Sequence, residues 1–142
     1  MSFSGVAEYT FDTLTVGQDA SFLHTVLQRE VDDFARVSGD YSPLHVDAVY
    51  ASTTPFGKNV VHGMYLGSLV SQLVGMQLPG LYALLASLQI EFKKPTFVGD
   101  DLNVAGTIIH KSSAIRMIEI KVKILRSTDL VAEATAHVRL LQ

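Results

Sequence analysis

The chain of 142 residues contains neither cysteine nor tryptophan. The absence of cysteine excludes thiol catalysis, cysteine-ligated zinc or iron–sulfur clusters, and any disulfide framework. A chain without disulfides fits a reducing compartment, so we predict a cytoplasmic location. Residues 1–5 also lack the basic start and apolar run of a secretory signal, and we expect no export.

Charged residues are scarce. The chain has 11 Lys+Arg and 14 Asp+Glu, a net charge of −3, and its longest basic run is Lys93-Lys94. Phosphate backbones are bound by clustered cations, so we expect no nucleic acid partner. Hydrophobic residues make up 48% of the chain and charged residues only 18%. This balance leaves apolar surface for another subunit to cover, which predicts a homodimer or a higher homo-oligomer.

Formal charge is absent between Lys58 and Glu91, over more residues than a membrane span needs. Pro79-Gly80 divides this stretch into a helix and a strand, each too short to cross a bilayer. Polar residues also interrupt the stretch, namely Ser68, Ser71, Gln72 and Gln77. We therefore expect a buried helix and no membrane partner.

Hydrophobic periodicity predicts three helices. The first covers residues 29–38 and ends at Gly39, a good C-terminal cap. A loop follows, and Asp47 is a suitable N-cap for a short helix over residues 48–53. The longest helix covers residues 63–76, where small residues are expected to let it lie close to a sheet.

Alternating hydrophobic residues predict five strands, over residues 20–28, 82–92, 102–111, 114–125 and 131–141. The last four strands are joined by short connections, so we expect them to pair as an antiparallel meander. The predicted fold is α+β: a curved antiparallel sheet of about five strands wrapped around a long central helix. Short extra helices lie between the first strand and the central helix. One domain spans residues 1–142, and residues 1–16 form an N-terminal extension.

Asp40 and His45 are separated by five positions on a segment that contains Pro43. We expect the proline to keep this segment out of helical geometry, so that the carboxylate and the imidazole can face one small molecule. Together they could handle a water molecule, one group accepting a proton while the other exchanges one. Such a pair suits the addition of water to a carbon–carbon double bond, or its removal. An aspartate in a turn and a histidine without a catalytic role are the alternative.

Gly63 begins the longest helix, directly after His62. A backbone N–H at the positive end of a helix can stabilise an oxyanion, such as the enolate formed when water adds beside a thioester carbonyl. A glycine that only permits a tight turn is the alternative. We expect His62 to orient the turn through a hydrogen bond. Ser71, two turns further along, could help to line a pocket.

Motifs of other kinds of reaction centre are absent from the sequence. The sequence has no G-x-S-x-G turn for a serine hydrolase and no H-E-x-x-H metal motif, so we expect no metal ion. The glycines near residue 63 lack the lysine of a nucleotide-binding loop.

Five ordered blocks resemble a known family. They are residues 38–47 (Ser-Gly-Asp-Tyr-Ser-Pro-Leu-His-Val-Asp), 51–56 (Ala-Ser-Thr-Thr-Pro-Phe), 60–64 (Val-Val-His-Gly-Met), 78–80 (Leu-Pro-Gly) and 92–100 (Phe-Lys-Lys-Pro-Thr-Phe-Val-Gly-Asp). From about Gly17 to the C-terminus the chain is similar to the single-domain MaoC-like (R)-specific enoyl-CoA hydratases and 3-hydroxyacyl thioester dehydratases, which have a hot-dog fold.

The resemblance implies that the long helix is wrapped by the sheet and that two subunits join their sheets, with each active site near the interface. It also implies reversible hydration of a trans-2-enoyl thioester to an (R)-3-hydroxyacyl thioester. Asp40 and His45 would activate the water and the Gly63 amide would polarise the carbonyl, while Ser71 matches a supporting helix serine. Ser42 departs from the Asn usual in the family. It could still make the local turn hydrogen bond, and it leaves open whether the acyl group is carried by coenzyme A or by a carrier protein.

Two other readings remain open: a non-catalytic hot-dog partner or acyl-binding module, and an acyl thioesterase. No cofactor is expected beyond the coenzyme A or phosphopantetheine arm of the substrate. Cations available for that arm are Lys58, Lys93, Lys94 and Arg116. Side chains expected to set the acyl chain length are Tyr50, Phe56, Met64 and Leu81.

Overall fold

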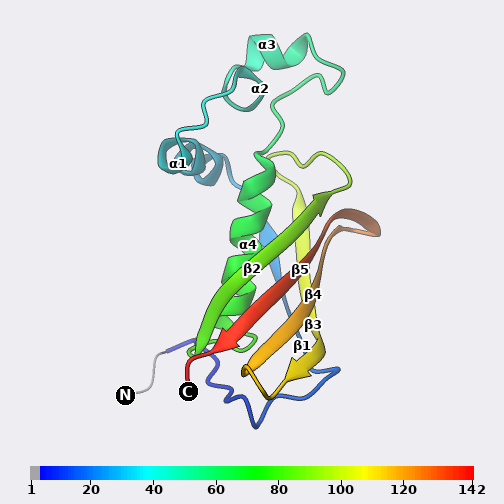
Figure 1. Cartoon of the computed structure of the whole chain (residues 1–142). Helices are drawn as coiled ribbons and strands as arrows, with labels where there is room; N and C mark the ends of the chain where they lie inside the picture. The colour runs from blue at the N-terminus through cyan, green and yellow to red at the C-terminus, as the bar shows by residue number, and fades with distance from the viewer. Residues whose placement is uncertain (1–3) are drawn as a thin grey trace.

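The computed structural model describes residues 4–142, and Figure 1 shows a curved sheet beside one long helix. Residues 1–3 of the predicted N-terminal extension lie outside the described residues. The elements in chain order are β1 (Asp19–Thr25), α1 (Gln28–Ser38), α2 (Pro43–Val46), α3 (Ala48–Ser52), α4 (Gly63–Met76), β2 (Ala83–Phe92), β3 (Asp101–Ser112), β4 (Met117–Arg126) and β5 (Asp129–Leu140). The predicted α+β architecture, with five strands and a long central helix, is confirmed.

The strands form one antiparallel sheet in the order β1-β3-β4-β5-β2. Strands β3, β4 and β5 form the expected meander. The prediction that β2 belongs to the same meander beside β3 was wrong, because β2 pairs with β5 at the opposite edge, from Ala83↔Leu140 to Phe92↔Ala132. Residues 93–100 therefore form a crossing segment rather than a hairpin turn. They pass the start of α4, where the Val61 N–H donates to the Thr96 carbonyl at 2.8 Å.

Helix α4 is the centre of the core. It contacts β1, β2, β3 and β5, and its buried side chains are Tyr65, Leu66, Leu69, Val70, Leu73 and Val74. The alternation in β4 puts Ile118, Ile120, Val122 and Ile124 on the buried face. No helix of the described residues is long and apolar enough to cross a membrane.

The close approach of helix and sheet depends on Gly106 in β3. A Cβ atom at this position would lie 2.5 Å from Cδ2 of Leu73. We expected four small residues of the helix to make this approach. Gly67 is buried, but a Cβ atom there would meet only Met64 of the same helix, and Ser68, Ser71 and Gly75 are exposed on another face of α4. The sheet, not the helix, provides the space.

The segment before β1 packs against the end of α4. Phe11 and Leu14 are buried in the core cluster, and the Ala7 N–H donates to the Met76 carbonyl at 2.8 Å. The Lys111 ammonium from β3 donates to the Phe11 carbonyl at 2.8 Å. The described part of the predicted extension thus contributes side chains to the core.

Helices α1, α2 and α3 lie between β1 and α4 in sequence, and α2 and α3 stand beyond the end of α4 in Figure 1. The predicted cap of α3 is confirmed, because Oδ1 of Asp47 accepts hydrogen bonds from the Val49 and Tyr50 N–H groups at 2.9 and 3.0 Å. Helix α2 was predicted as a loop. Pro43 occupies its first turn, where the missing N–H leaves no hydrogen bond unmade, so the proline begins a helical turn instead of preventing one.

Candidate active site

Asp40 follows directly on the end of α1. Gly39 adopts the left-handed conformation, with φ of 74°, and its N–H donates to the Ala35 carbonyl, which ends the helix and turns the chain. The Ser42 N–H then donates to Oδ1 of Asp40 at 3.1 Å, which orients the carboxylate. The other oxygen, Oδ2, faces His45, and the side chain is 51% exposed, so solvent reaches it.

His45 is held in place by a backbone carbonyl. Its Nδ1 lies 2.6 Å from the carbonyl oxygen of Val60, which can only accept, so Nδ1 carries the proton in this contact. Its Nε2 therefore presents a lone pair when the ring is neutral. This atom lies 3.9 Å from Oδ2 of Asp40. The separation is too long for a direct hydrogen bond. A water oxygen about 2.8 Å from each atom fits between them.

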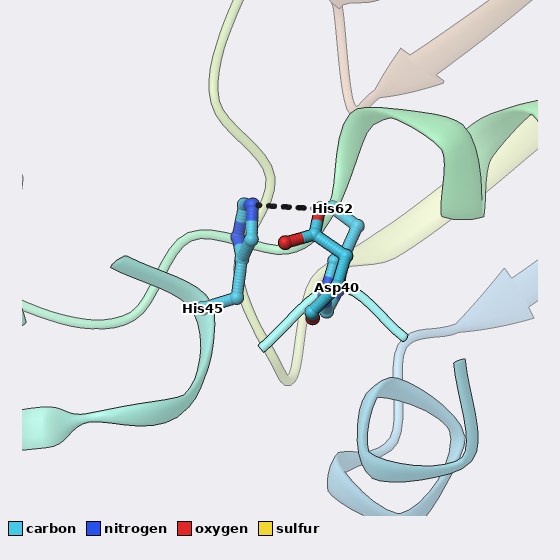
Figure 2. A group of neighbouring side chains, drawn as sticks. All are labelled: Asp40, His45 and His62. Carbon is cyan, nitrogen blue, oxygen red and sulfur yellow. Dashed lines mark hydrogen bonds and ion pairs between the residues drawn. The ribbon is translucent and has the colours of Figure 1, made fainter. Parts of the chain in front are cut away.

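His62 lies behind this pair and is 2% exposed. Its Nε2 donates to the backbone carbonyl of Asp40 at 2.9 Å. Figure 2 shows the three side chains close together, with Asp40 and His45 from the segment that follows α1 and His62 from the start of α4. The His45 and His62 rings stack with their centroids 4.0 Å apart. The Phe34 ring of α1 packs on the other side chain of this stack, His62, with a centroid separation of 5.0 Å. Nδ1 of His62 is buried and has no partner among the described residues.

Asp40, His45 and His62 are close enough for a shared metal ion, because one potential ligand atom of each lies within 4.8 Å of the others. Their orientation does not fit this role. A histidine binds a metal in the plane of its ring, about 2.0–2.1 Å from the nitrogen. The two rings are stacked with an angle of 27° between their planes, so their lone pairs do not converge on one point. A bridged water fits the Asp40 and His45 atoms better.

Gly63 is the first residue of α4, so its N–H has no partner within the helix. A Cβ atom here would lie 3.0 Å from two ring carbons of Phe92. Glycine thus allows the aromatic ring to cover the helix start. The residue borders a cavity of about 310 Å³ whose walls are His45, Phe56, Val60, Val61, Gly63, Leu66, Phe92, Lys94, Pro95 and Thr96. The mostly apolar cavity can hold an acyl chain beside one imidazole and one helix N-terminus.

The predicted residues are brought together only in part. Phe56 lines the cavity with His45 and Gly63. Tyr50 and Met64 are 50% and 57% exposed and are not among the lining residues.

Leu81 and Ser71 lie away from the cavity of the same chain. Leu81 follows the opposite end of α4, where its N–H donates to the Ala7 carbonyl. The helix has 14 residues, which corresponds to a length of about 21 Å. Ser71 is exposed on α4, away from the lining residues.

Ser42 contributes its backbone rather than its hydroxyl. Its carbonyl accepts from the His45 N–H at 2.8 Å, and its side chain makes no capping hydrogen bond. The expectation that the hydroxyl replaces the turn hydrogen bond of Asn was therefore wrong. The reason is that the His45 N–H, in the one-turn helix α2, donates to the backbone carbonyl of Ser42 and leaves the Ser42 hydroxyl no turn hydrogen bond to make.

Of the four predicted cations, Lys94 lines the cavity and also donates to Asp129 Oδ1 at 2.7 Å. The Lys58 ammonium lies 4.3 Å above the Phe97 ring. Lys93 pairs with Glu91. Arg116 precedes β4 and donates to the Gln142 carbonyl at 2.7 Å.

Sequence reasoning missed these lining residues: Val60, Val61, Leu66, Phe92, Pro95 and Thr96. Phe92, Pro95 and Thr96 belong to the family block at residues 92–100. No local pattern predicts that this block lies beside the start of α4, because that follows from the position of β2 at the edge of the sheet.

Residues 12–129 match the family described as MaoC like domain. The chain belongs to the MaoC-like family. It is 44% identical over 90 residues to the (R)-specific enoyl-CoA hydratase of Aeromonas caviae, which covers 63% of this chain and 67% of the relative. It is 32% identical over 108 residues to the (R)-specific enoyl-CoA hydratase of Rhodospirillum rubrum, covering 76% and 75% of the two chains.

Solved structures of MaoC-like proteins have the same fold. The unliganded R-hydratase PhaJ1 of Pseudomonas aeruginosa superposes with a TM-score of 0.89 at 30% identity, over 95% of this chain and 87% of the other. The (R)-hydratase of A. caviae superposes with a TM-score of 0.86 at 35% identity, over 90% and 98%. The predicted family and hot-dog fold are confirmed.

Proposed function

We propose that this MaoC-like protein is a hydro-lyase that reversibly hydrates a trans-2-enoyl thioester to an (R)-3-hydroxyacyl thioester. The observation that supports this most is the distance of 3.9 Å between Asp40 Oδ2 and His45 Nε2. His45 also borders the cavity, together with the free amide of Gly63. The (R) configuration is taken from the printed names of the two hydratase relatives.

In the proposed reaction, water bound between Asp40 and His45 attacks C3 of the enoyl group. His45 Nε2 accepts a proton from this water, and the carboxylate of Asp40 stabilises the imidazolium. The new C3–O bond moves the double-bond electrons onto the carbonyl oxygen, where the Gly63 N–H stabilises the enolate. His45 then returns the proton to C2, so that one water is added and the enzyme is regenerated. Dehydration follows the same steps in reverse.

Coenzyme A is the proposed carrier of the acyl group. Several relatives are named as hydratases or dehydratases of CoA thioesters, while a relative from Arabidopsis thaliana, 32% identical over 101 residues, is named as an acyl-carrier-protein dehydratase. In support of a bound coenzyme A arm, Lys94 at the cavity wall offers a cation to its phosphates. The reaction as written uses no cofactor beyond this arm.

The experiment is an assay of the purified protein with a series of trans-2-enoyl-CoA substrates. Hydration removes the absorbance of the conjugated thioester without releasing free thiol, and chiral analysis identifies the product. Asp40→Asn keeps the side-chain shape but removes the charge, and we expect a loss of about 100-fold or more in kcat. Release of thiol would instead support the acyl thioesterase. No turnover of any enoyl thioester, including carrier-protein substrates, would support the acyl-binding module.

We further propose a cytoplasmic homodimer. In support, β2 is an edge strand with unpaired backbone groups, and it carries Leu84 at 49% exposure. Met76 at the end of α4 adds exposed apolar surface. Light scattering coupled to size-exclusion chromatography tests this, and a monomer at micromolar concentration would contradict it. Fractionation of cells tests the compartment.

A further inference from the structure

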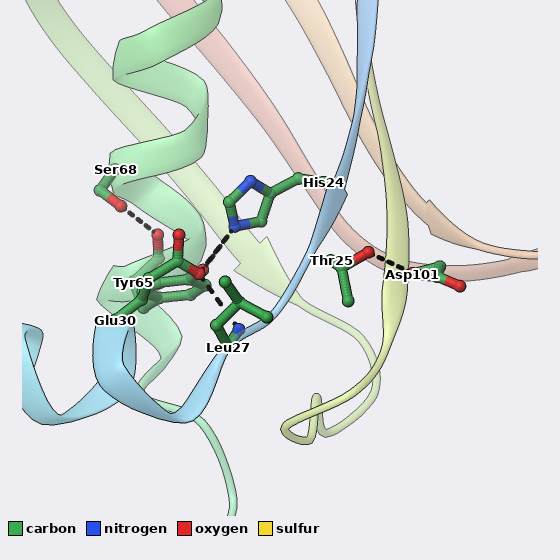
Figure 3. A network of polar contacts seen from close by, with 7 residues as sticks. All are labelled: His24, Thr25, Leu27, Glu30, Tyr65, Ser68 and Asp101. Atoms are coloured by element: carbon green, nitrogen blue, oxygen red, sulfur yellow. Dashed lines mark hydrogen bonds and ion pairs between the residues drawn. The ribbon is translucent and has the colours of Figure 1, made fainter.

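A polar network outside the cavity joins β1, α1 and α4, as Figure 3 shows. The Tyr65 hydroxyl donates to Oε2 of Glu30 at 2.9 Å. Nε2 of His24 lies 2.8 Å from the Tyr65 hydroxyl and 3.1 Å from the same carboxylate oxygen. The Leu27 N–H donates to this oxygen as well, at 3.1 Å. One carboxylate oxygen of Glu30 thus contacts β1 through His24, α4 through Tyr65 and the N-cap of its own helix through Leu27.

The network is tightly held. Tyr65 is only 4% exposed. Burial, followed by the hydrogen bond and charge of Glu30, raises the pKa of Tyr65, so its hydroxyl remains a donor. Burial acts to raise the pKa of Glu30, but hydrogen bonds from Leu27 and Tyr65 and the charge of His24 together lower it. Glu30 therefore remains the acceptor at neutral pH.

The position of the network relative to the active site suggests its role. Glu30 lies in the first turn of α1, and Tyr65 lies in the first turn of α4, two residues after Gly63. The other end of α1 leads directly to Asp40, whose carbonyl accepts from His62 at 2.9 Å. Helix α1 is therefore tied to the N-terminal end of α4 at both of its ends.

We propose that Tyr65 and Glu30 are positioning residues, which hold α1 so that Asp40 keeps its place relative to His45 and Gly63. This inference rests on the proposed hydration activity. Without the Tyr65–Glu30 hydrogen bond, the first turn of α1 loses its polar contact with α4. The far end is still held by the Asp40–His62 hydrogen bond and by the packing of Phe34 on His62, so α1 can tilt about that end and move the carboxylate. Displacement of a catalytic group by about 1 Å can reduce the rate by about 100-fold. Partial loosening of one helix is expected to cost about 10-fold.

Tyr65→Phe is the direct test, because it removes the hydroxyl and keeps the buried ring. We expect kcat for a trans-2-enoyl-CoA to fall about 10-fold while KM changes less than about 2-fold, since neither residue lines the cavity. Glu30→Ala should act in the same way. Glu30→Gln retains a carbonyl oxygen that can accept from Leu27 and Tyr65, and it should restore most of the lost kcat.

Thr25→Val is the matched control. Thr25 follows His24 in β1 and is also drawn in Figure 3. The substitution removes the hydrogen bond of 2.5 Å from the Thr25 hydroxyl to Asp101 Oδ1. We expect kcat to remain within about 2-fold of the unaltered protein, since this bond does not hold α1. Assays run well below every melting temperature separate positioning from unfolding.

Coupling provides a second criterion. If Tyr65 and Glu30 act through one shared contact, the kcat of the double variant Tyr65→Phe/Glu30→Ala should be no lower than that of the less active single variant. Unchanged kcat in folded Tyr65→Phe, or an effect on KM alone, would overturn the inference. NMR signals of the His45 and His62 rings give a readout without substrate: they should shift in Tyr65→Phe and not in Thr25→Val. An inactive unaltered protein refutes the proposed function, whereas unshifted ring signals refute the positioning role.

Discussion

His45 can be altered so that its two nitrogens are tested separately. The amide nitrogen of asparagine occupies nearly the place of Nδ1, and that of glutamine reaches the place of Nε2. His45→Asn can therefore keep the 2.6 Å contact with the Val60 carbonyl, while it loses the nitrogen that faces Asp40. His45→Gln loses the Val60 contact and puts a non-basic nitrogen beside Asp40.

The expected sizes follow from these contacts. General acid–base groups contribute about 10²- to 10⁴-fold to rate, so kcat should fall by at least about 100-fold in both variants. Both also lose the stacking of the ring on His62, worth about 0.5–1.5 kcal/mol. His45→Gln additionally leaves the Val60 carbonyl without its donor, at a cost of about 1 kcal/mol. The free energy of unfolding should therefore decrease in the order unaltered protein, His45→Asn, His45→Gln.

The assay combines single-turnover kinetics with urea denaturation of the three proteins. Hydration by His45→Asn within about 3-fold of the unaltered rate would refute the role of Nε2 as the proton acceptor. A His45→Gln protein more stable than His45→Asn would refute the assignment of Nδ1 as the donor to Val60. If both variants have strongly reduced rates but equal free energies of unfolding, His45 is the proton acceptor and its contact with the Val60 carbonyl does not stabilise the fold.

Three further predictions concern other parts of the molecule. Gly63→Ala places a methyl group 3.0 Å from the Phe92 ring and should reduce kcat/KM at least about 10-fold; melting should change little, because alanine favours the helix, and unaltered turnover would contradict the role of the helix start. Gly106→Ala should lower the free energy of unfolding by about 1–3 kcal/mol through the 2.5 Å approach to Leu73; Gly106→Ala/Leu73→Val should recover part of it in denaturant titrations. The lowered pKa of Glu30 predicts a stability contribution that is present above pH 4.5 and lost on acidification through the folded-state pKa. The stability advantage over Glu30→Gln should therefore shrink as the pH falls below 4.5 in denaturant titrations, and a constant difference would contradict it.

Local patterns in the sequence were sufficient for the helices and strands other than α2 and for the centre of the site. The alternation in β4 separates buried Ile118 and Ile120 from Glu119 on the other face, and the structure shows this separation. Asp47 caps α3 through a contact that involves only its neighbours. Asp40 and His45 lie on one short segment, so their proximity required no knowledge of the sheet.

Long-range pairing was beyond these patterns. A short connection between two strands suggests a hairpin, yet β2 pairs with β5, whose sequence comes last in the chain. This pairing positions Phe92 at the start of α4 and leads residues 93–100 across the cavity. The lining residues Phe92 and Thr96 therefore follow from strand order. Leu81, expected to help set the acyl chain length, lies instead at the opposite end of α4 from the cavity.

The anchoring of the two imidazoles was equally hidden, and for a physical reason. His45 donates to the carbonyl of Val60, and His62 donates to the carbonyl of Asp40. Every residue has a backbone carbonyl, so such an anchor leaves no side-chain signature at the accepting position. The same holds for Ser42, which supports Asp40 through its N–H. Substitution of Asn by Ser at this position keeps the bond that orients the carboxylate, because any residue other than proline has this N–H. The departure from the family pattern therefore leaves the proposed chemistry intact, and its effect is expected on the solvent side of the turn.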